Sequence, residues 1–265
     1  MAYTTASDGA RLHWETHGSG DPVLLIMGLG SNAYGWHRTI PWLAECYETI
    51  AFDNRGTGRS DAPAGDYTIA QMAADAAAVL DAAGHRTAQV VGASLGGMIA
   101  QRFALTHPER VRSLVLLCTT PGGRNAVRAS DAVMAGLVSG GEDPATVYRK
   151  NAWFLYGDET RDRHPERIEE DLVYRAKIPT PPTGYFGQLR AAMGHDTFEE
   201  LPALAVPTLV VHGDADLLVP TDNGKLLAGR IPNAELVLLP GAGHMLQADA
   251  GDTVRESVLA FLSRA

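Results

Sequence analysis

A serine, two aspartates and a histidine stand in this chain where they could support nucleophilic catalysis. Ser94 lies in Gly92-Ala93-Ser94-Leu95-Gly96, which has the pattern G-x-S-x-G. A serine hydroxyl becomes a strong nucleophile only when a neighbouring base removes its proton. The pentapeptide is not specific alone, because about one chain in ten of this length and composition would contain it by chance. The alternative is a glycine-rich turn with an idle serine, so the surrounding sequence must decide.

The residues on either side of Ser94 favour the catalytic interpretation. An apolar run, residues 89–91, leads into the motif, and an amphipathic segment, residues 98–103, leaves it. A strand that turns sharply into a helix holds the serine in a strained conformation at the carboxyl edge of a sheet. Gly92 and Gly96 leave room for the strand and the helix to approach each other closely.

Acyl transfer also needs two N–H donors at the point where the carbonyl oxygen becomes an anion. We expect one from Leu95, which follows the serine. The loop Met27-Gly28-Leu29-Gly30 comes directly after an apolar run and is the candidate for the second donor, with Leu29 as the residue. A plain glycine turn is the alternative for this loop.

The base is expected to be a histidine, since its pKa lies near neutral pH. Of the 9 histidines, His244 is distinguished by a glycine-rich loop after an apolar strand. The acid that orients the base is expected at a strand end, where both Asp214 and Asp216 stand. Either choice gives the chain order serine, aspartate, histidine.

The elements that must position these residues alternate between strand and helix. We expect strands at 23–27, 49–52, 88–91, 113–117, 208–212 and 235–239, and helices at 68–83, 95–106, 221–229 and 252–262. Such alternation is typical of a parallel sheet with crossover helices on both faces.

Residues 122–197 break this alternation and contain no clear strand. The segment has charged helical stretches, such as residues 161–174, and many prolines and aromatic residues. We therefore predict a helical cap at 122–197, inserted into an α/β core of residues 1–121 and 198–265. A peripheral helical subdomain is the alternative. Candidates for an apolar substrate pocket, each of which could equally be core, are Leu29, Trp36, Trp153, Phe154, Leu218 and Met245.

The composition limits the partners of the chain. The 265 residues carry a formal net charge of -9, which disfavours nucleic acid and anionic membrane surfaces. The N-terminus lacks the pattern of a secretion signal and no apolar run could span a bilayer, so we expect a cytoplasmic location. Cys46 and Cys118 are expected to be buried, reduced thiols. We expect no metal and no cofactor, and a homodimer is left open.

With these residues in place, the chain resembles the α/β-hydrolase superfamily along nearly its whole length. Residues 52–60 are similar to the family's D-x-R-G-x-G-x-S turn, and Gly213-Asp214-Ala215-Asp216 matches its G-x-x-D, which assigns the acid to Asp216. The resemblance implies a mostly parallel eight-stranded sheet, helices on both faces and a lid after strand 6. One departure is Met27-Gly28 in the oxyanion loop, where relatives often have His-Gly.

The resemblance to small bacterial esterases, lactone hydrolases and enol-lactonases implies a serine hydrolase for a small ester or lactone. Ser94, Asp216 and His244 would be catalytic, and Leu29 and Leu95 would form the oxyanion hole. Serine at position 94 argues against haloalkane dehalogenases and epoxide hydrolases, which carry aspartate there. A cofactor-free C–C bond hydrolase, a perhydrolase or haloperoxidase-type enzyme, and a non-catalytic ligand receptor are the alternatives.

Overall fold

Eight strands form one sheet in the order β1-β2-β4-β3-β5-β6-β7-β8 in the computed structural model, which describes residues 2–139 and 143–265. The first two strands pair antiparallel, β2 also runs antiparallel to β4, and all other neighbours are parallel. The strands are β1 Ala2–Thr5, β2 Arg11–His17, β3 Pro22–Ile26, β4 Glu48–Phe52, β5 Ala88–Ala93, β6 Val111–Leu117, β7 Thr208–Gly213 and β8 Glu235–Leu239. The predicted α/β sheet, mostly parallel, is confirmed.

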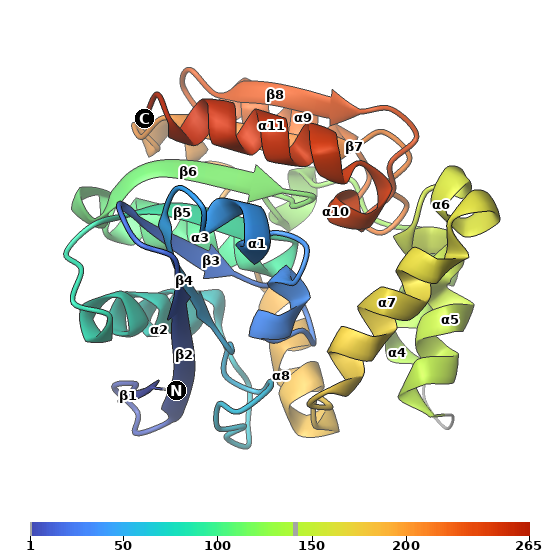
Figure 1. Ribbon diagram of the computed structural model, residues 1–265, viewed down its shortest axis with the longest axis horizontal. Coiled ribbons are helices and arrows are strands. Elements are labelled where there is room, and N and C mark those ends of the chain that lie inside the picture. The colour runs from blue at the N-terminus through green and yellow to red at the C-terminus, as the bar shows by residue number, and fades with distance from the viewer. Residues whose placement is uncertain (1, 140–142) are drawn as a thin grey trace.

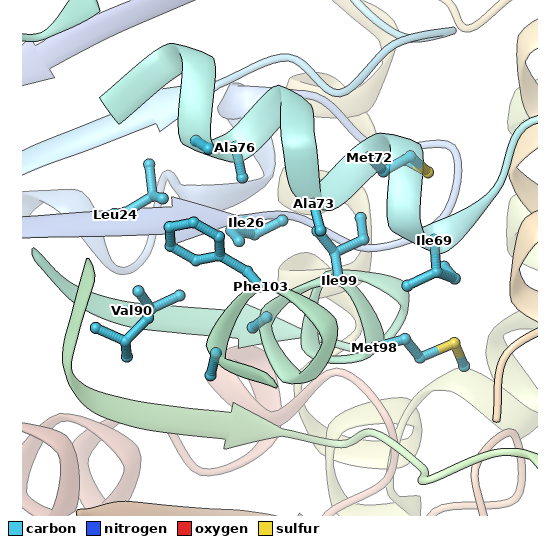
Figure 2. Packing of buried hydrophobic residues seen from close by; sticks show 14 of the residues in the cluster. Leu24, Ile26, Ile69, Met72, Ala73, Ala76, Val90, Met98, Ile99 and Phe103 are labelled. Atoms are coloured by element: carbon cyan, nitrogen blue, oxygen red, sulfur yellow. The ribbon is translucent and has the colours of Figure 1, made fainter. Parts of the chain in front are cut away.

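Helices cover both faces of the sheet. On one face lie α2 (Ile69–Ala82), α3 (Leu95–Thr106) and α9 (Asp222–Arg230), and on the other α1 (Ile40–Leu43) and α11 (Gly251–Leu262). Figure 2 shows the first face, where Ile99 and Phe103 of α3 and Ala73 of α2 pack over Leu24 and Val90 of the sheet. Every residue of β3, β5 and β7 is buried, as expected for strands covered on both faces.

The ends of helix α2 (Ile69–Ala82) lie close to those predicted from the sequence, because capping residues mark both of them. Thr68 precedes the helix, and its side chain accepts a hydrogen bond from the N–H of Gln71, which caps the first turn. Gly84 follows the helix with a φ of +85°, a conformation that favours glycine at helix ends. The predicted helix at 68–83 begins at this capping threonine and ends just before Gly84.

In the residues that the structure describes between β6 and β7, there are five α-helices: α4 (Asp131–Val138), α5 (Pro144–Leu155), α6 (Asp158–Arg163), α7 (Pro165–Ala176) and α8 (Pro182–Met193). Figure 1 shows α4 to α7 grouped on the side toward which β6 and β8 point. The helical stretch expected at 161–174 is split between α6 and α7, because Pro165 starts a new helix and His164 leaves the helical conformation.

The two ends of this helical segment are held together. Gly122 and Asp196 form an antiparallel bridge, the N–H of Gly123 donates to the carbonyl of His195 at 2.9 Å, and the N–H of Thr197 donates to the carbonyl of Pro121 at 2.9 Å. This pairing lies at the positions where the sequence predicts the cap to begin and end. The division into core and cap stays a prediction.

The remaining elements are short. They are α10 (Leu246–Asp249) and the 3₁₀ helices η1 (Ala33–Trp36), η2 (Pro108–Arg110), η3 (Gly123–Asn125) and η4 (Leu201–Ala203). Within residues 2–139 and 143–265, no helix has the length and apolar character needed to cross a membrane.

The expectation that both cysteines are buried is wrong for Cys46. Both thiols are free, and Cys118 is buried, but Cys46 is exposed. Cys46 lies in the turn between α1 and β4, where its N–H donates to the carbonyl of Leu43. Only the neighbours Leu43 and Tyr47 turn inward there, so the apolar surroundings in sequence do not bury the thiol.

Candidate active site

The turn at Ser94 has the strained geometry that the sequence predicts. Ser94 joins β5 to α3 with φ 55° and ψ −120°, outside the regions that non-glycine residues normally occupy. A Cβ at Gly96 would lie 1.9 Å from the carbonyl oxygen of Ile26, and one at Gly92 would lie 2.4 Å from that of Gly96. Both glycines of the motif are therefore required by close backbone contact.

The backbone around Ser94 is fixed by the next strand of the sheet. The N–H of Ser94 donates to the carbonyl of Leu117 at 2.9 Å, and the hydroxyl of Thr119 donates to the carbonyl of Ser94 at 2.7 Å. A Cβ at Gly97 would lie 2.6 Å from that of Thr119. The end of β6 thus supports the turn that presents the serine.

The predicted oxyanion loop adjoins the serine. A Cβ at Gly28 would lie 3.6 Å from the Oγ of Ser94, so this glycine keeps the space beside the hydroxyl free. Leu29 follows Gly28, and Leu95 opens α3, where the first N–H groups have no acceptor within the helix. The two expected donors therefore belong to two segments that both adjoin Ser94: the loop after β3 and the start of α3.

The helical segment holds the far end of the same loop. Gln188 of α8 is fully buried, and its Oε1 accepts the N–H of Gly30 at 2.9 Å. Its Nε2 donates to the carbonyl of Arg55 at 2.8 Å. Sequence reasoning missed Gln188, because a single glutamine in a helix gives no sign of which loop it will contact.

The aspartate and the histidine meet in loops that follow neighbouring strands. The Nδ1 of His244, after β8, lies 2.8 Å from the Oδ2 of Asp216, after β7. The other carboxylate oxygen of Asp216 accepts the N–H groups of Leu218 at 2.9 Å and Val219 at 2.8 Å. The structure therefore pairs the predicted base with Asp216, the aspartate that the resemblance assigns.

The ionisation of Asp216 follows from its partners. Burial would raise its pKa, but the charge of His244 and the hydrogen bonds of His212 and His244 outweigh burial and lower the pKa to about 2. The Nε2 of His212 lies 3.5 Å from the Oδ2 of Asp216 and 2.8 Å from the carbonyl of Val219. Since a carbonyl only accepts, this nitrogen carries a proton that also faces the carboxylate. The sequence reasoning did not select His212. Its one signal there is a polar residue at the end of an apolar strand.

Asp214, the other candidate acid, has a different contact. Its Oδ1 accepts the N–H of Gly241 at 2.6 Å, and its side chain is exposed. Gly241 begins the loop that carries His244. Asp214 therefore holds the first residue of the histidine loop, whereas Asp216 contacts the imidazole itself.

Cys118 shows how close the serine and aspartate segments lie to each other. It follows β6, the strand between β5 and β7, and its N–H donates to the carbonyl of Val211 at 3.0 Å. Burial and the negative charge of Asp216 raise the pKa of the Cys118 thiol well above its usual value. The Asp216 carboxylate is thus in electrostatic range of the strand whose end supports Ser94.

The expected pocket residues differ in exposure. Trp36 is fully buried in the core cluster of the α11 face, and Phe154 is 1% exposed, so both pack as core side chains. Trp153 packs edge-on against Phe154 and is 41% exposed. Leu218 and Met245 are half-buried, as is Leu29, which packs on the α3 face of the sheet. Of the alternatives left open by the sequence, the structure favours core for Trp36 and Phe154.

Comparison with known proteins gives one family. A family model described as the alpha/beta hydrolase fold matches residues 21–250. A protein of Azorhizobium caulinodans named carbamate hydrolase RutD is 34% identical over 262 residues, covering 98% of each chain. A poly(3-hydroxyalkanoate) depolymerase of Ectopseudomonas oleovorans is 34% identical over 246 residues, covering 92% of this chain and 84% of its own.

Among solved structures, similarity extends over the whole fold. The structure of Est816, titled an N-acyl homoserine lactone degrading enzyme, superposes with a TM-score of 0.85 at 27% identity. The alignment covers 98% of this chain and 100% of the Est816 chain. The helical segment between β6 and β7 is thus included in a match that leaves almost no residue out.

Proposed function

We propose that this chain, which belongs to the α/β-hydrolase family, is a serine hydrolase that cleaves a small carboxylic ester or lactone. The observation that carries the proposal is the contact of 2.8 Å between His244 Nδ1 and Asp216 Oδ2. It leaves the other imidazole nitrogen, Nε2, to act as the base for Ser94.

In the proposed reaction, the Nε2 of His244 takes the hydroxyl proton of Ser94 while Oγ attacks the substrate carbonyl carbon. The N–H groups of Leu29 and Leu95 stabilise the oxyanion. The C–O bond to the leaving alcohol breaks, and the alcohol takes the proton from His244. Water then adds to the acyl-enzyme by the same route, which releases the acid and restores Ser94.

Asp216 supports this cycle without exchanging a proton. Its lowered pKa keeps it ionised at neutral pH, so it stabilises the imidazolium that forms in each half-reaction. The Nδ1 contact also fixes the tautomer in which Nε2 is free to accept a proton. Trp153, Leu218 and Met245 remain the proposed lining for the acyl or alcohol group.

Relatives support the class of bond. A poly(3-hydroxyalkanoate) depolymerase and an N-acyl homoserine lactone degrading enzyme act, by their names, on a polyester and a lactone. Carbamate hydrolysis is a second candidate, since a relative covering 98% of this chain carries that name. A carbamate presents the same type of carbonyl to the nucleophile.

The proposal is tested by replacing the nucleophile. Ser94→Ala should lower the hydrolysis of a short-chain nitrophenyl ester on the order of 10⁵- to 10⁶-fold, because no acyl-enzyme can form. A fluorophosphonate should label the wild type at Ser94 and leave the variant unlabelled. Ser263→Ala, which changes an exposed hydroxyl near the C-terminus, is the control. Wild-type turnover by Ser94→Ala would refute the assignment.

A substrate panel then separates the candidate reactions. Aryl esters, methyl esters, lactones, carbamates and β-diketones of graded size are compared by kcat/KM. We expect esters or lactones to lead. A preference for carbamates would select the second candidate, and a preference for β-diketones would point to C–C bond cleavage.

A further inference from the structure

The loop that carries His244 lies directly against the turn between α5 and α6. A Cβ at Gly157 would lie 2.1 Å from the carbonyl oxygen of Gly241, and one at Gly243 would lie 2.8 Å from the backbone of Tyr156. Neither position can hold a larger residue unless the backbone moves. The two turns therefore contact each other backbone to backbone, with a glycine on each side.

Hydrogen bonds connect the same two turns. The N–H of Met245, next to His244, donates to the carbonyl of Leu155 at 2.9 Å. One oxygen of Asp249, its Oδ2, accepts both the N–H of Gly243 at 2.8 Å and the N–H of Gly157 at 2.9 Å. The peptide groups on both sides of His244 are thus bonded to the helical segment or to the carboxylate that bridges to it.

Asp249 is held in place for this role. It is the last residue of α10, the short helix that follows the histidine loop, and its N–H donates to the carbonyl of Met245 at 3.0 Å. Burial raises the pKa of its carboxyl group, whereas the hydroxyl of Thr160 and the N–H groups of Gly157 and Gly243 work in the opposite direction. A partly buried carboxylate depends on such hydrogen-bond donors to offset the cost of its burial.

We propose that Asp249 is a positioning residue for His244. It holds His244 in position by joining the α5–α6 turn to the histidine loop. This inference rests on the proposed function for the role of His244 as base. Asp216 fixes the imidazole through Nδ1, but the backbone from which the ring projects needs its own support. A displacement of about 1 Å at a reacting group can cost about 10²-fold in rate.

The helical segment therefore also contributes to the position of His244. Its α5–α6 turn forms one half of the support for the base, so a movement of that turn away from the core is coupled to the position of His244. Within the part of the chain that the structure describes, Asp249 forms no hydrogen bond or ion pair with the imidazole or with Ser94. Its effect on the reaction passes through the backbone of Gly243 and Gly157.

The first test replaces the carboxylate. Asp249→Ala should lower kcat by about 10- to 100-fold with KM within about 3-fold, because the base is misplaced and the substrate contacts are kept. Asp249→Asn should retain activity within a few-fold, since its amide oxygen can accept the same two N–H groups. Asp252→Ala, an exposed acid three residues further along, is the matched control and should behave as wild type.

The second test does not depend on the substrate. In Asp249→Ala, the amides of Gly157 and Gly243 should exchange with deuterium faster and together, and the rate of fluorophosphonate labelling at Ser94 should fall in proportion to kcat. If Asp249→Ala does not fold, Asp249→Glu, which displaces the carboxylate by one methylene group, is expected to show the same changes.

The outcomes separate this proposal from the proposed function. Unchanged kcat, labelling and amide exchange in Asp249→Ala would overturn the proposal, as would an increase in KM at constant kcat or an equal loss in Asp249→Asn. If wild-type Ser94 is not labelled at all, the proposed function fails. Exchange at the two glycine amides then still decides whether Asp249 holds the two turns together.

Discussion

At the scale of single residues, the site depends on which atom of each polar group is used. Asp216 directs one oxygen to His244 and the other to two backbone N–H groups, so both oxygens are occupied and the carboxylate cannot rotate freely. The Oδ1 of Asp214, two residues earlier, accepts the N–H of Gly241 instead. Two aspartates that look equivalent in the sequence therefore have unequal roles in the folded chain.

This difference predicts the ranking of two conservative variants. Asp216→Asn should lower kcat by up to about 10⁴-fold, because an amide neither stabilises the imidazolium nor fixes its tautomer. Asp214→Asn should cost about 10-fold or less, since the amide oxygen can still accept the Gly241 N–H. Steady-state kinetics on the same ester decide, and a larger loss at position 214 would contradict the assignment.

At the scale of elements, the strand–turn–helix unit around Ser94 is possible only because strands β3 and β5 and helix α3 approach one another at backbone distance. Gly96 meets the backbone of β3 and Gly92 meets the backbone of α3, whereas Gly97 faces the side chain of Thr119. The Ala-rich face of α2 packs on α3 over the same strands (Figure 2). The turn at Ser94 is therefore part of the core packing and should resist local unfolding.

Two glycine-to-alanine variants test that argument. Gly96→Ala should lower the free energy of unfolding by at least about 3 kcal/mol, because the new methyl group meets the carbonyl of Ile26 at 1.9 Å and backbone must move. Gly229→Ala is the control: it lies exposed in α9 with nothing within 4 Å of the added group. There we expect a gain of about 0.5 to 1 kcal/mol from helix propensity. Urea denaturation measures both, and a stable Gly96→Ala protein would contradict the close approach.

At the scale of the whole molecule, the helical segment is fastened to the core at several distant points. Asp171 of α7 is buried and accepts hydrogen bonds from Arg38 and Tyr156 at 2.8 Å each. Burial opposes its ionisation, but the contacts of His37, Arg38 and Tyr156 outweigh burial and lower its pKa. Gln188 and Asp249 add the contacts that connect the segment to the two loops of the proposed site.

His195, where the helical segment rejoins the core, predicts a dependence of stability on pH. Burial, and then the charge of Arg102, lower its pKa from 6.5 to about 4. Because the folded value lies below the unfolded one, this contribution is complete above pH 6.5 and is lost as the pH falls toward 4. A shift of this size corresponds to about 3 kcal/mol at most.

We therefore expect the free energy of unfolding to fall between pH 6.5 and 4, and His195→Gln to reduce that fall by about 2 to 3 kcal/mol. Denaturant titrations at pH 7, 6, 5 and 4 measure the effect. His17→Gln, at an exposed position of β2, should keep the wild-type dependence. Identical pH dependence in His195→Gln and wild type would show that His195 is not the group responsible.

Much of the fold could be predicted from the sequence because its signals are local. Strands such as 235–239, the capped helix at 68–83 and the glycines around Ser94 each depend on residues within a few positions of one another. The α/β fold and the turn at Ser94 followed from them. The bounds of α3 matched at both ends for the same reason.

The tertiary structure decided which distant segments meet. Whether Asp214 or Asp216 faces His244, whether Cys46 is buried, and whether Trp36 lies in the core depend on packing between segments far apart in the chain. The bridge from Asp249 to Gly157 spans 92 positions, and that from Gln188 to Gly30 spans 158. A single sequence records periodicity and turn chemistry along the chain, but such contacts exist only once the sheet and the helical segment have packed together.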